Sequence, residues 1–284
     1  MRKKYFLSLF VLACLLLAGS GCASSKIEVV EAPGLKSVSL GTLDSAEAAQ
    51  KINLVRGNTI KMKQKFSEAG VKLADAYAMG SEGERELVIR RFAPGFNADI
   101  EWKYKTMIGD ETANYSGAVV GGDLQSAHEL FLPVYWQEGE KTAMGSGIIW
   151  LSQDVFENLS KAGVSTFSFG ILNKEENEAL VASSTKNGFN YALSKLDGEV
   201  RAIIGNKDVY LTTAEKDFGE YTLKVNGEDV KVQVIKASNW FGEILVLNNK
   251  QNPMVLKVTT NDLAGGDLAG FYDYEITELN GLVE

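Results

Sequence analysis

The chain has 284 residues, of which 45% are hydrophobic and 10% aromatic, and it carries 37 acidic against 29 basic side chains. This apolar content is enough for a sizeable core, which excludes a disordered stalk. The formal net charge of −8 argues against nucleic acid as a partner and against binding to an anionic membrane surface through bulk charge.

The first 21 residues have the pattern of a secretory signal peptide. Three basic residues at positions 2–4 precede a mostly apolar run over 5–18, and small residues occupy 19–21. This order of charged, apolar and small residues is typical of a segment that is removed after export. The apolar run is shorter than the roughly 20 residues that a membrane-spanning helix needs. A permanent transmembrane anchor is therefore the weaker interpretation.

The end of this segment carries a more specific motif. Residues 17–22 read Leu-Ala-Gly-Ser-Gly-Cys, which resembles the lipobox of bacterial lipoproteins, although Gly19 stands where that motif usually has leucine. The resemblance implies that the Cys22 thiol is alkylated by a diacylglyceryl group and that Cys22 becomes the acylated N-terminus. Two or more acyl chains hold a protein stably on a membrane. The alternative is an ordinary signal peptide cut near Gly21 or Ala23, with Cys22 incidental.

The resemblance also bears on location. Ala23 follows the cysteine, and in proteobacterial lipoproteins a residue other than aspartate at this place implies sorting to the outer membrane, with the body in the periplasm or at the cell surface. The chain's other cysteine, Cys14, lies in the apolar run. The mature chain would therefore have no disulfide and would fold on its core alone.

The remaining chain is interpreted as a tether and a body. Residues 22–40 contain Ser, Pro and Gly without a clear period, which is typical of a polar, mobile linker, although 27–30 would also suit an edge strand. Residues 41–284 form the expected globular domain. If it has two parts, the boundary is expected at 173–187.

The body begins with a predicted helix. Asp44 is placed to cap its N-terminus, and Gly57 is placed to end it. Ala48, Ile52 and Val55 fall on one face of a helix over these residues. We therefore expect this face to pack against the core.

Alternating patterns follow. Residues 60–66 alternate apolar side chains with lysines, which predicts a strand with its lysines facing water, as on an exposed sheet edge. An uninterrupted helix through Met79 is the alternative, and residues 67–79 are predicted to be helical in either case. Residues 99–106 place apolar or aromatic side chains at every second position, as a half-buried strand does.

A second helix is predicted between Ser152, as its N-cap, and Gly163, just past its end. The chain on both sides of it is expected to form strands. Besides those above, the predicted strands cover residues 129–136, 145–151, 165–171, 221–234, 242–247, 254–260 and 271–279.

The clearest hairpin centres on Asn226-Gly227, a dipeptide that suits a type I′ turn. The expected cross-strand pairs are Val225 with Glu228, Leu223 with Val230, and Tyr221 with Val232. Many short strands joined by polar turns predict a mainly β fold with a few short helices, arranged as an antiparallel sandwich or a partly closed barrel.

Motifs for chemistry are weak. His128 is the chain's one histidine, and Leu132 stands where a metalloprotease motif would need a second. Ser183 and Lys186 match the spacing of a β-lactamase nucleophile, but the companion elements of that site are missing. The acidic residues at 262–273 are interpreted as a solvated turn rather than a calcium site. We expect no catalytic residue, metal or cofactor.

The tryptophans are the candidate binding residues. Trp102, Trp136, Trp150 and Trp240 lie in or beside predicted strands. Facing one cavity, they would bind an apolar ligand or a glycan. Packing in the core or on a sheet face is the alternative.

The sequence thus indicates a lipid-anchored bacterial envelope protein whose leading role is non-enzymatic. It would serve as a carrier of an apolar ligand or as an accessory subunit that pairs with an envelope protein. The competing hypothesis is an envelope glycan hydrolase, which would need two facing carboxylates roughly 5 to 10 Å apart.

Overall fold

The computed structural model describes residues 39–64, 83–108, 111–133, 136, 138–143, 145–169, 210–261 and 273–283. The predicted signal peptide at 1–21, Cys22, the helix at 67–79 and the boundary at 173–187 lie outside them. Among the described residues, no helix has both the length and the apolar character needed to cross a membrane.

The described strands belong to one mixed sheet, and the fold is mainly β, as predicted. The strands are β1 (Thr59–Gln64), β2 (Gly83–Ala93), β3 (Asn97–Ile108), β4 (Glu111–Asp123), β5 (Gly139–Thr142), β6 (Val164–Thr166), β7 (Leu211–Ala214), β8 (Gly219–Val225), β9 (Glu228–Asn239), β10 (Gly242–Leu247), β11 (Val255–Thr260) and β12 (Tyr274–Asn280).

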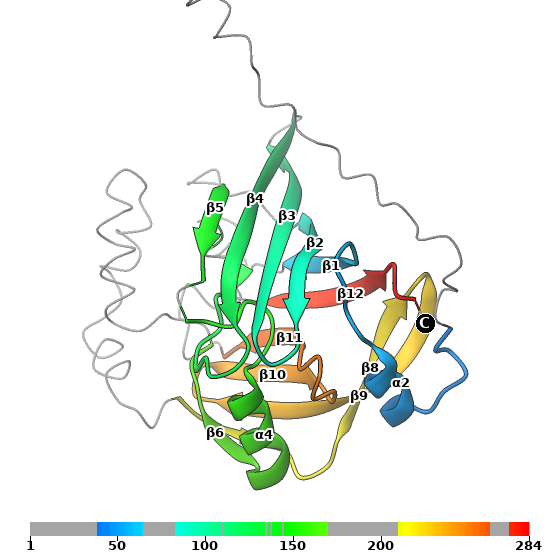
Figure 1. Ribbon diagram of the computed structural model, residues 1–284, viewed down its shortest axis with the longest axis vertical. Coiled ribbons are helices and arrows are strands. Elements are labelled where there is room, and N and C mark those ends of the chain that lie inside the picture. Colours follow the sequence, from blue (N-terminus) through cyan, green and yellow to red (C-terminus); the bar gives the residue numbers. More distant parts are fainter. Residues whose placement is uncertain are drawn as a thin grey trace, which may run out of the picture. The chain divides into compact units, whose positions relative to one another are not determined.

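Five of these strands close into a barrel. Of the two predicted architectures, a sandwich and a partly closed barrel, the structure therefore has the barrel. Strands β8 to β12 pair in succession as an antiparallel meander, and β12 returns to pair with β8 (Figure 1). The closing pair is parallel, because in an odd number of alternating strands the first and last run in the same direction. Alternate side chains of these strands are buried, as the interior of a small barrel requires.

Strand β12 is the junction of the sheet. On one side it pairs along its length with β1. On its other side its first residues pair with β11 and its last residues pair with β8. The closure is reinforced by side chains: the Tyr221 hydroxyl donates to the Ile276 carbonyl at 2.7 Å, and the Asn226 amide bonds both backbone groups of Leu282.

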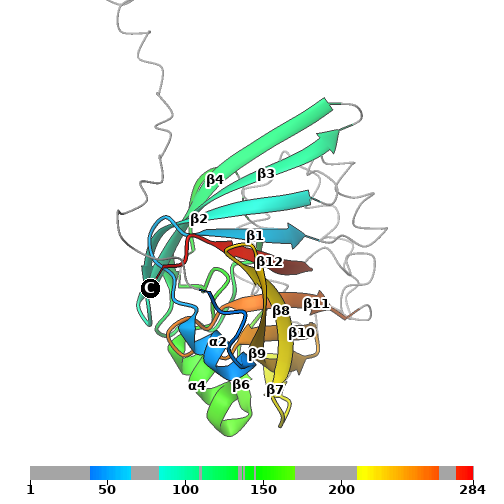
Figure 2. The same cartoon turned by 90° about the vertical axis from the view of Figure 1, so that its right-hand side faces the viewer.

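The other strands continue the sheet away from the barrel. Strands β1 to β4 are joined by antiparallel pairing, and β5 is added in parallel to β4. We call β1 to β5 the extension. Figure 2 shows its strands β1 to β4 fanning out from β12 on one side of the barrel. One face of the extension is apolar and joins the core, whereas the other is charged.

The predicted alternation at 60–66 is confirmed for the part in β1: Ile60 and Met62 are fully buried between lysines. The expectation of an exposed edge is wrong, because β1 pairs with β2 on one side and β12 on the other. The alternative of a helix running through these residues is also wrong.

Two helices lie in the described part of the chain. Helix α4 (Gln153–Ala162) matches its prediction, with the Ser152 hydroxyl accepting from the Val155 N–H and Gly163 in the left-handed conformation. It packs against β6 and β7. Helix α2 (Ser45–Lys51) begins at the predicted cap, Asp44, and packs against β9.

Helix α2 ends earlier than predicted. Its C-cap is Ile52, and Val55 is 51% exposed rather than buried. The physical reason lies in the loop between β10 and β11, where the Asn249 side chain donates to the carbonyls of Ala49 and Ile52. Because these amide bonds satisfy the terminal carbonyls, the helix does not continue to Gly57.

Two predicted strands are wrong. The described residues of 129–136 and 145–151 are mostly buried, but they form isolated bridges, at Leu130 with Gly147 and at Trp150 with Met254, instead of ladders. Pro133 supplies no N–H for a ladder. The predicted strand at 165–171 is regular through Thr166, whereas β10 and β11 match their predicted segments closely.

Candidate functional site

The feature that stands out chemically is a buried arginine. Along β2, Glu84 and Glu86 are exposed while Arg85, Leu87 and Ile89 are buried. Arg85 therefore occupies a position where the alternation of a strand calls for an apolar side chain. It is 8% exposed, and it is the one charged residue in the buried class among the described residues.

Aromatic rings surround its guanidinium. The Cζ atom of Arg85 lies 4.8 Å from the ring centroid of Trp102, 5.0 Å from that of Tyr104 and 5.6 Å from that of Trp136. All three rings are buried. Contacts of this geometry are cation–π interactions, each worth roughly 0.5 to 2 kcal/mol. We call these four residues the Arg85 cluster.

The sheet register brings the cluster together. Arg85 is the cross-strand partner of Tyr104 on β3, and Trp102 lies two residues before Tyr104, on the same face. Trp136 comes from the segment after β4, where its indole N–H donates to the Phe131 carbonyl at 2.6 Å. This hydrogen bond fixes the Trp136 ring over the apolar face of the extension.

A glycine makes room for Trp102. Gly117 on β4 is its cross-strand partner, and a Cβ atom there would lie 2.9 Å from the Trp102 ring and 2.6 Å from the Gly139 carbonyl oxygen on β5. Both distances are too short for real contacts. The site is therefore built on a small residue that permits the indole to lie across β4.

The cluster has hydrogen-bond donors without acceptors. Within the described part of the chain, Nε and Nη1 of Arg85 and Nε1 of Trp102 are buried and make no hydrogen bond. Each such group costs about 1 to 3 kcal/mol. Burial lowers the pKa of Arg85 to about 10, which still leaves the side chain a cation at neutral pH.

The chemistry available to such a site is binding. A charged guanidinium and an indole N–H both donate, and neither acts as a base or nucleophile at neutral pH. The rings add flat apolar surface. The cluster can therefore hold a ligand with hydrogen-bond acceptors.

The four candidate tryptophans separate into two groups. Trp102 and Trp136 meet around Arg85. Trp150 is fully buried elsewhere, where its indole N–H donates to Asn252 at 2.8 Å. Trp240 lies at the turn between β9 and β10, with its ring 5.0 Å from that of Phe241. The described structure therefore brings two of the four together.

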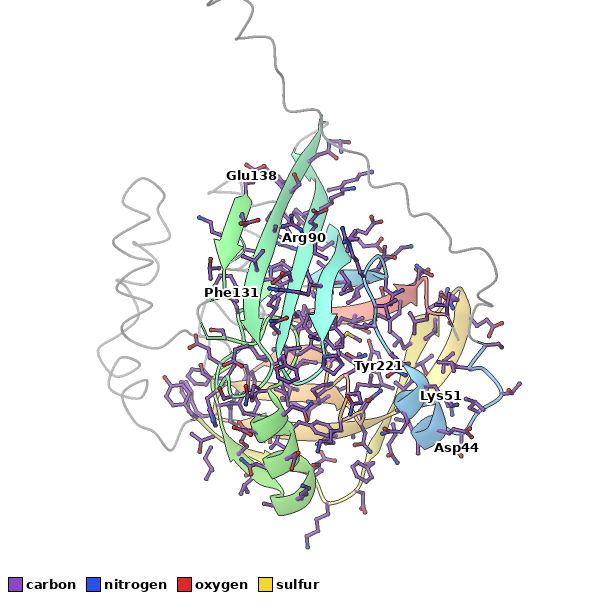
Figure 3. All side chains as sticks on the ribbon, in the orientation of Figure 1. Asp44, Lys51, Arg90, Phe131, Glu138 and Tyr221 are labelled. Atoms are coloured by element: carbon purple, nitrogen blue, oxygen red, sulfur yellow. The ribbon has the colours of Figure 1, made fainter. Side chains whose placement is uncertain are left out.

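Among the residues whose burial the structure describes, no aspartate or glutamate belongs to the buried class. On the charged face of the extension, Arg90 bridges Glu101 at 3.2 Å and Glu140 at 3.1 Å. Figure 3 shows Arg90 on this part of the sheet and Glu138 at the start of β5. Glu101 and Glu140 are thus held by a cation in the open, unlike the paired carboxylates that a glycan hydrolase needs in a cleft.

The other candidate motifs from the sequence form no catalytic or metal site in the described part of the chain. His128 is exposed, and its Nδ1 lies 2.7 Å from the Thr166 carbonyl oxygen, which makes Nδ1–H the donor. No group of three His, Cys, Asp or Glu side chains in the described ranges is placed to hold a metal ion. The segments 183–186 and 262–272 lie outside those ranges.

Three residues of the site, Arg85, Tyr104 and Gly117, are not among the site residues predicted from the sequence. One signal was present: a basic residue in phase with Leu87 and Ile89 along β2. Comparison of the chain with protein-family models, with curated proteins and with solved structures finds no match.

Proposed function

We propose that this chain is an exported, lipid-anchored envelope protein whose body binds a ligand without transforming it. The observation that carries the binding role is the Arg85 cluster, a buried cation enclosed by three rings with three N–H groups that make no hydrogen bond among the described residues. Buried donors of this kind gain most when a bound molecule supplies the missing acceptors.

Retention of such a group has a physical cost. Removing a guanidinium from water costs several kcal/mol, and the cation–π contacts offset only part of it. A purely structural core would be more stable with an apolar residue at this position. We interpret Arg85 as a residue whose role is to meet a ligand.

The proposed location comes from the sequence. The charged start, the apolar run at 5–18 and the small residues before Cys22 support export and lipid attachment. Attachment at Cys22 would hold the body beside a membrane, with the outer membrane as the proposed destination. There the body would take up an apolar ligand or contact an envelope protein.

Native mass spectrometry tests the binding role. The full chain is produced in a bacterium, extracted from its envelope in a mild nonionic detergent, and measured after detergent release. A reproducible added mass beyond the lipid supports ligand binding and identifies the ligand's class. A clean mass for the lipidated chain alone contradicts it.

Metabolic labelling tests the anchor separately. Cells grown with an alkynyl fatty acid should label the wild-type chain, and the Cys22→Ser variant should remain unlabelled. The Cys14→Ser variant is the matched control and should be labelled like the wild type. Equal labelling of the wild type and Cys22→Ser would contradict lipidation at Cys22.

A further inference from the structure

We propose that the Arg85 cluster binds an oxyanion, either a carboxylate or a phosphate, carried by a molecule with a flat apolar body. This inference rests on the binding function proposed above and names the class of ligand. The arrangement of donors, charge and rings in the cluster leads to it in three steps.

The hydrogen bonds of the cluster call for a ligand with acceptors. Within the Arg85 cluster, the buried groups that make no hydrogen bond in the described structure are all donors: Nε and Nη1 of Arg85 and Nε1 of Trp102. A ligand that complements them must present acceptors. Carboxylate and phosphate oxygens accept several hydrogen bonds each and are the usual partners of guanidinium groups.

The ion pairs of β2 point to an anionic ligand. The neighbouring arginines of β2 each have a carboxylate partner, since Arg90 pairs with Glu101 and Arg91 pairs with Asp99 at 2.9 Å. Arg85 takes part in no ion pair among the described residues, although it is far more buried than either neighbour. Because a buried charge is stabilised chiefly by an opposite charge, the missing component is an anion.

The rings of the cluster indicate the body of the ligand. Trp102, Tyr104 and Trp136 enclose the guanidinium at 4.8 to 5.6 Å, and the ring of Tyr115 on β4 lies 6.4 Å from that of Tyr104. The surroundings of the charge are therefore aromatic and apolar. A ligand that fits therefore joins its oxyanion to a ring or to another flat apolar group.

A titration with small probes tests the inference. Tryptophan fluorescence of the full chain is followed while benzoate, phenyl phosphate or the neutral benzyl alcohol is added. We expect saturable changes with at least one oxyanion and a markedly weaker response to benzyl alcohol. Which of the two oxyanions binds more tightly distinguishes a carboxylate ligand from a phosphate ligand.

Variants assign the response to the cluster. Arg85→Met keeps the length of the side chain and removes its charge, and binding should weaken about tenfold to a hundredfold. Arg90→Met changes an arginine on the charged face of the same strand and should bind like the wild type. Trp102→Phe keeps a ring, removes one donor, and should weaken binding by a smaller factor.

Two results would overturn the inference. One is the absence of a saturable response to either oxyanion in the folded wild type. The other is binding that Arg85→Met and Trp102→Phe leave unchanged while circular dichroism shows both variants folded. A bound molecule that native mass spectrometry identifies as lacking a carboxylate or phosphate would also overturn the inference, but it would leave the binding function intact. No added mass at all would contradict the binding function itself.

Discussion

The substitution Asn249→Ala should lower the free energy of unfolding far more than the same substitution at the neighbouring Asn248. Asn249 is 1% exposed, and its side chain joins two distant parts of the chain. Its Nδ2 donates to the carbonyls of Ala49 at 2.9 Å and Ile52 at 3.0 Å. Its Oδ1 accepts from the backbone N–H groups of Gln251 at 2.9 Å and Asn252 at 3.2 Å.

The magnitude follows from these four bonds. Each contributes about 1 kcal/mol net, and truncation also leaves buried polar groups less well satisfied. The Ala49 carbonyl keeps a bond from the Ile52 N–H, and the Ile52 carbonyl keeps one from Asn252, which limits the loss. We expect the free energy of unfolding to fall by about 3 kcal/mol.

The assay is urea unfolding at neutral pH, followed by tryptophan fluorescence and circular dichroism. Asn248→Ala is the matched control, because the side chain of Asn248 makes one partly exposed bond with Gln233 and should cost less than about 1 kcal/mol. An Asn249→Ala protein as stable as Asn248→Ala would refute the reasoning that this loop fixes the end of helix α2.

Three further predictions concern the sheet. Gly117→Ala should lower the free energy of unfolding by about 1 to 3 kcal/mol and shift the fluorescence of Trp102, because its Cβ would overlap that ring; an unchanged emission spectrum would contradict this. Gly227→Ala should lower the free energy of unfolding by about 1 kcal/mol in urea, because Gly227 has a φ of +88°, which alanine disfavours, although the space around its Cβ position is open. An unchanged free energy of unfolding would contradict the type I′ turn. The hydrogen bond from Lys61 lowers the pKa of Glu278, so this carboxylate stabilises the fold above its ordinary pKa and loses that contribution as the pH falls. Glu278→Gln should therefore lose less stability than the wild type between pH 6 and pH 3 in the same assay, and parallel losses would count against the ion pair.

The parts of the fold that local patterns determine could be predicted. In the hairpin of β8 and β9, the observed pairs Val225 with Glu228, Leu223 with Val230, and Tyr221 with Val232 are those expected. Asn226 has φ of +48°, as the turn requires. The turn dipeptide and the alternation point to one register, so a single arrangement satisfies both.

Prediction failed where distant contacts decide the backbone. The end of α2 depends on Asn249, which lies far along the chain. Residues 129–136 are apolar enough for a strand, yet the backbone N–H of Leu130 bonds Ser168 and that of Phe131 bonds Gly147, so these neighbours do not share one partner strand. The sequence predicts mainly strands from Glu84 onward but does not delimit β4 within them, because the glycines that its neighbours require weaken its apolar alternation.

The candidate site could be predicted only in part. Aromatic residues in strands identified Trp102 and Trp136, but the same pattern included Trp150 and Trp240, which lie elsewhere. Arg85 stands between two glutamates, a local context typical of a solvated face. Only the pairing of β2 with β3 brings it against Trp102 and Tyr104.

Whether Arg85 meets a bound ligand is measured by native mass spectrometry of the wild type and of Arg85→Met, produced and extracted side by side, with unfolding midpoints recorded for both. We expect an added mass on the wild type that is lost or strongly reduced in a folded Arg85→Met protein. Equal added mass on both proteins, or none on either, would contradict it.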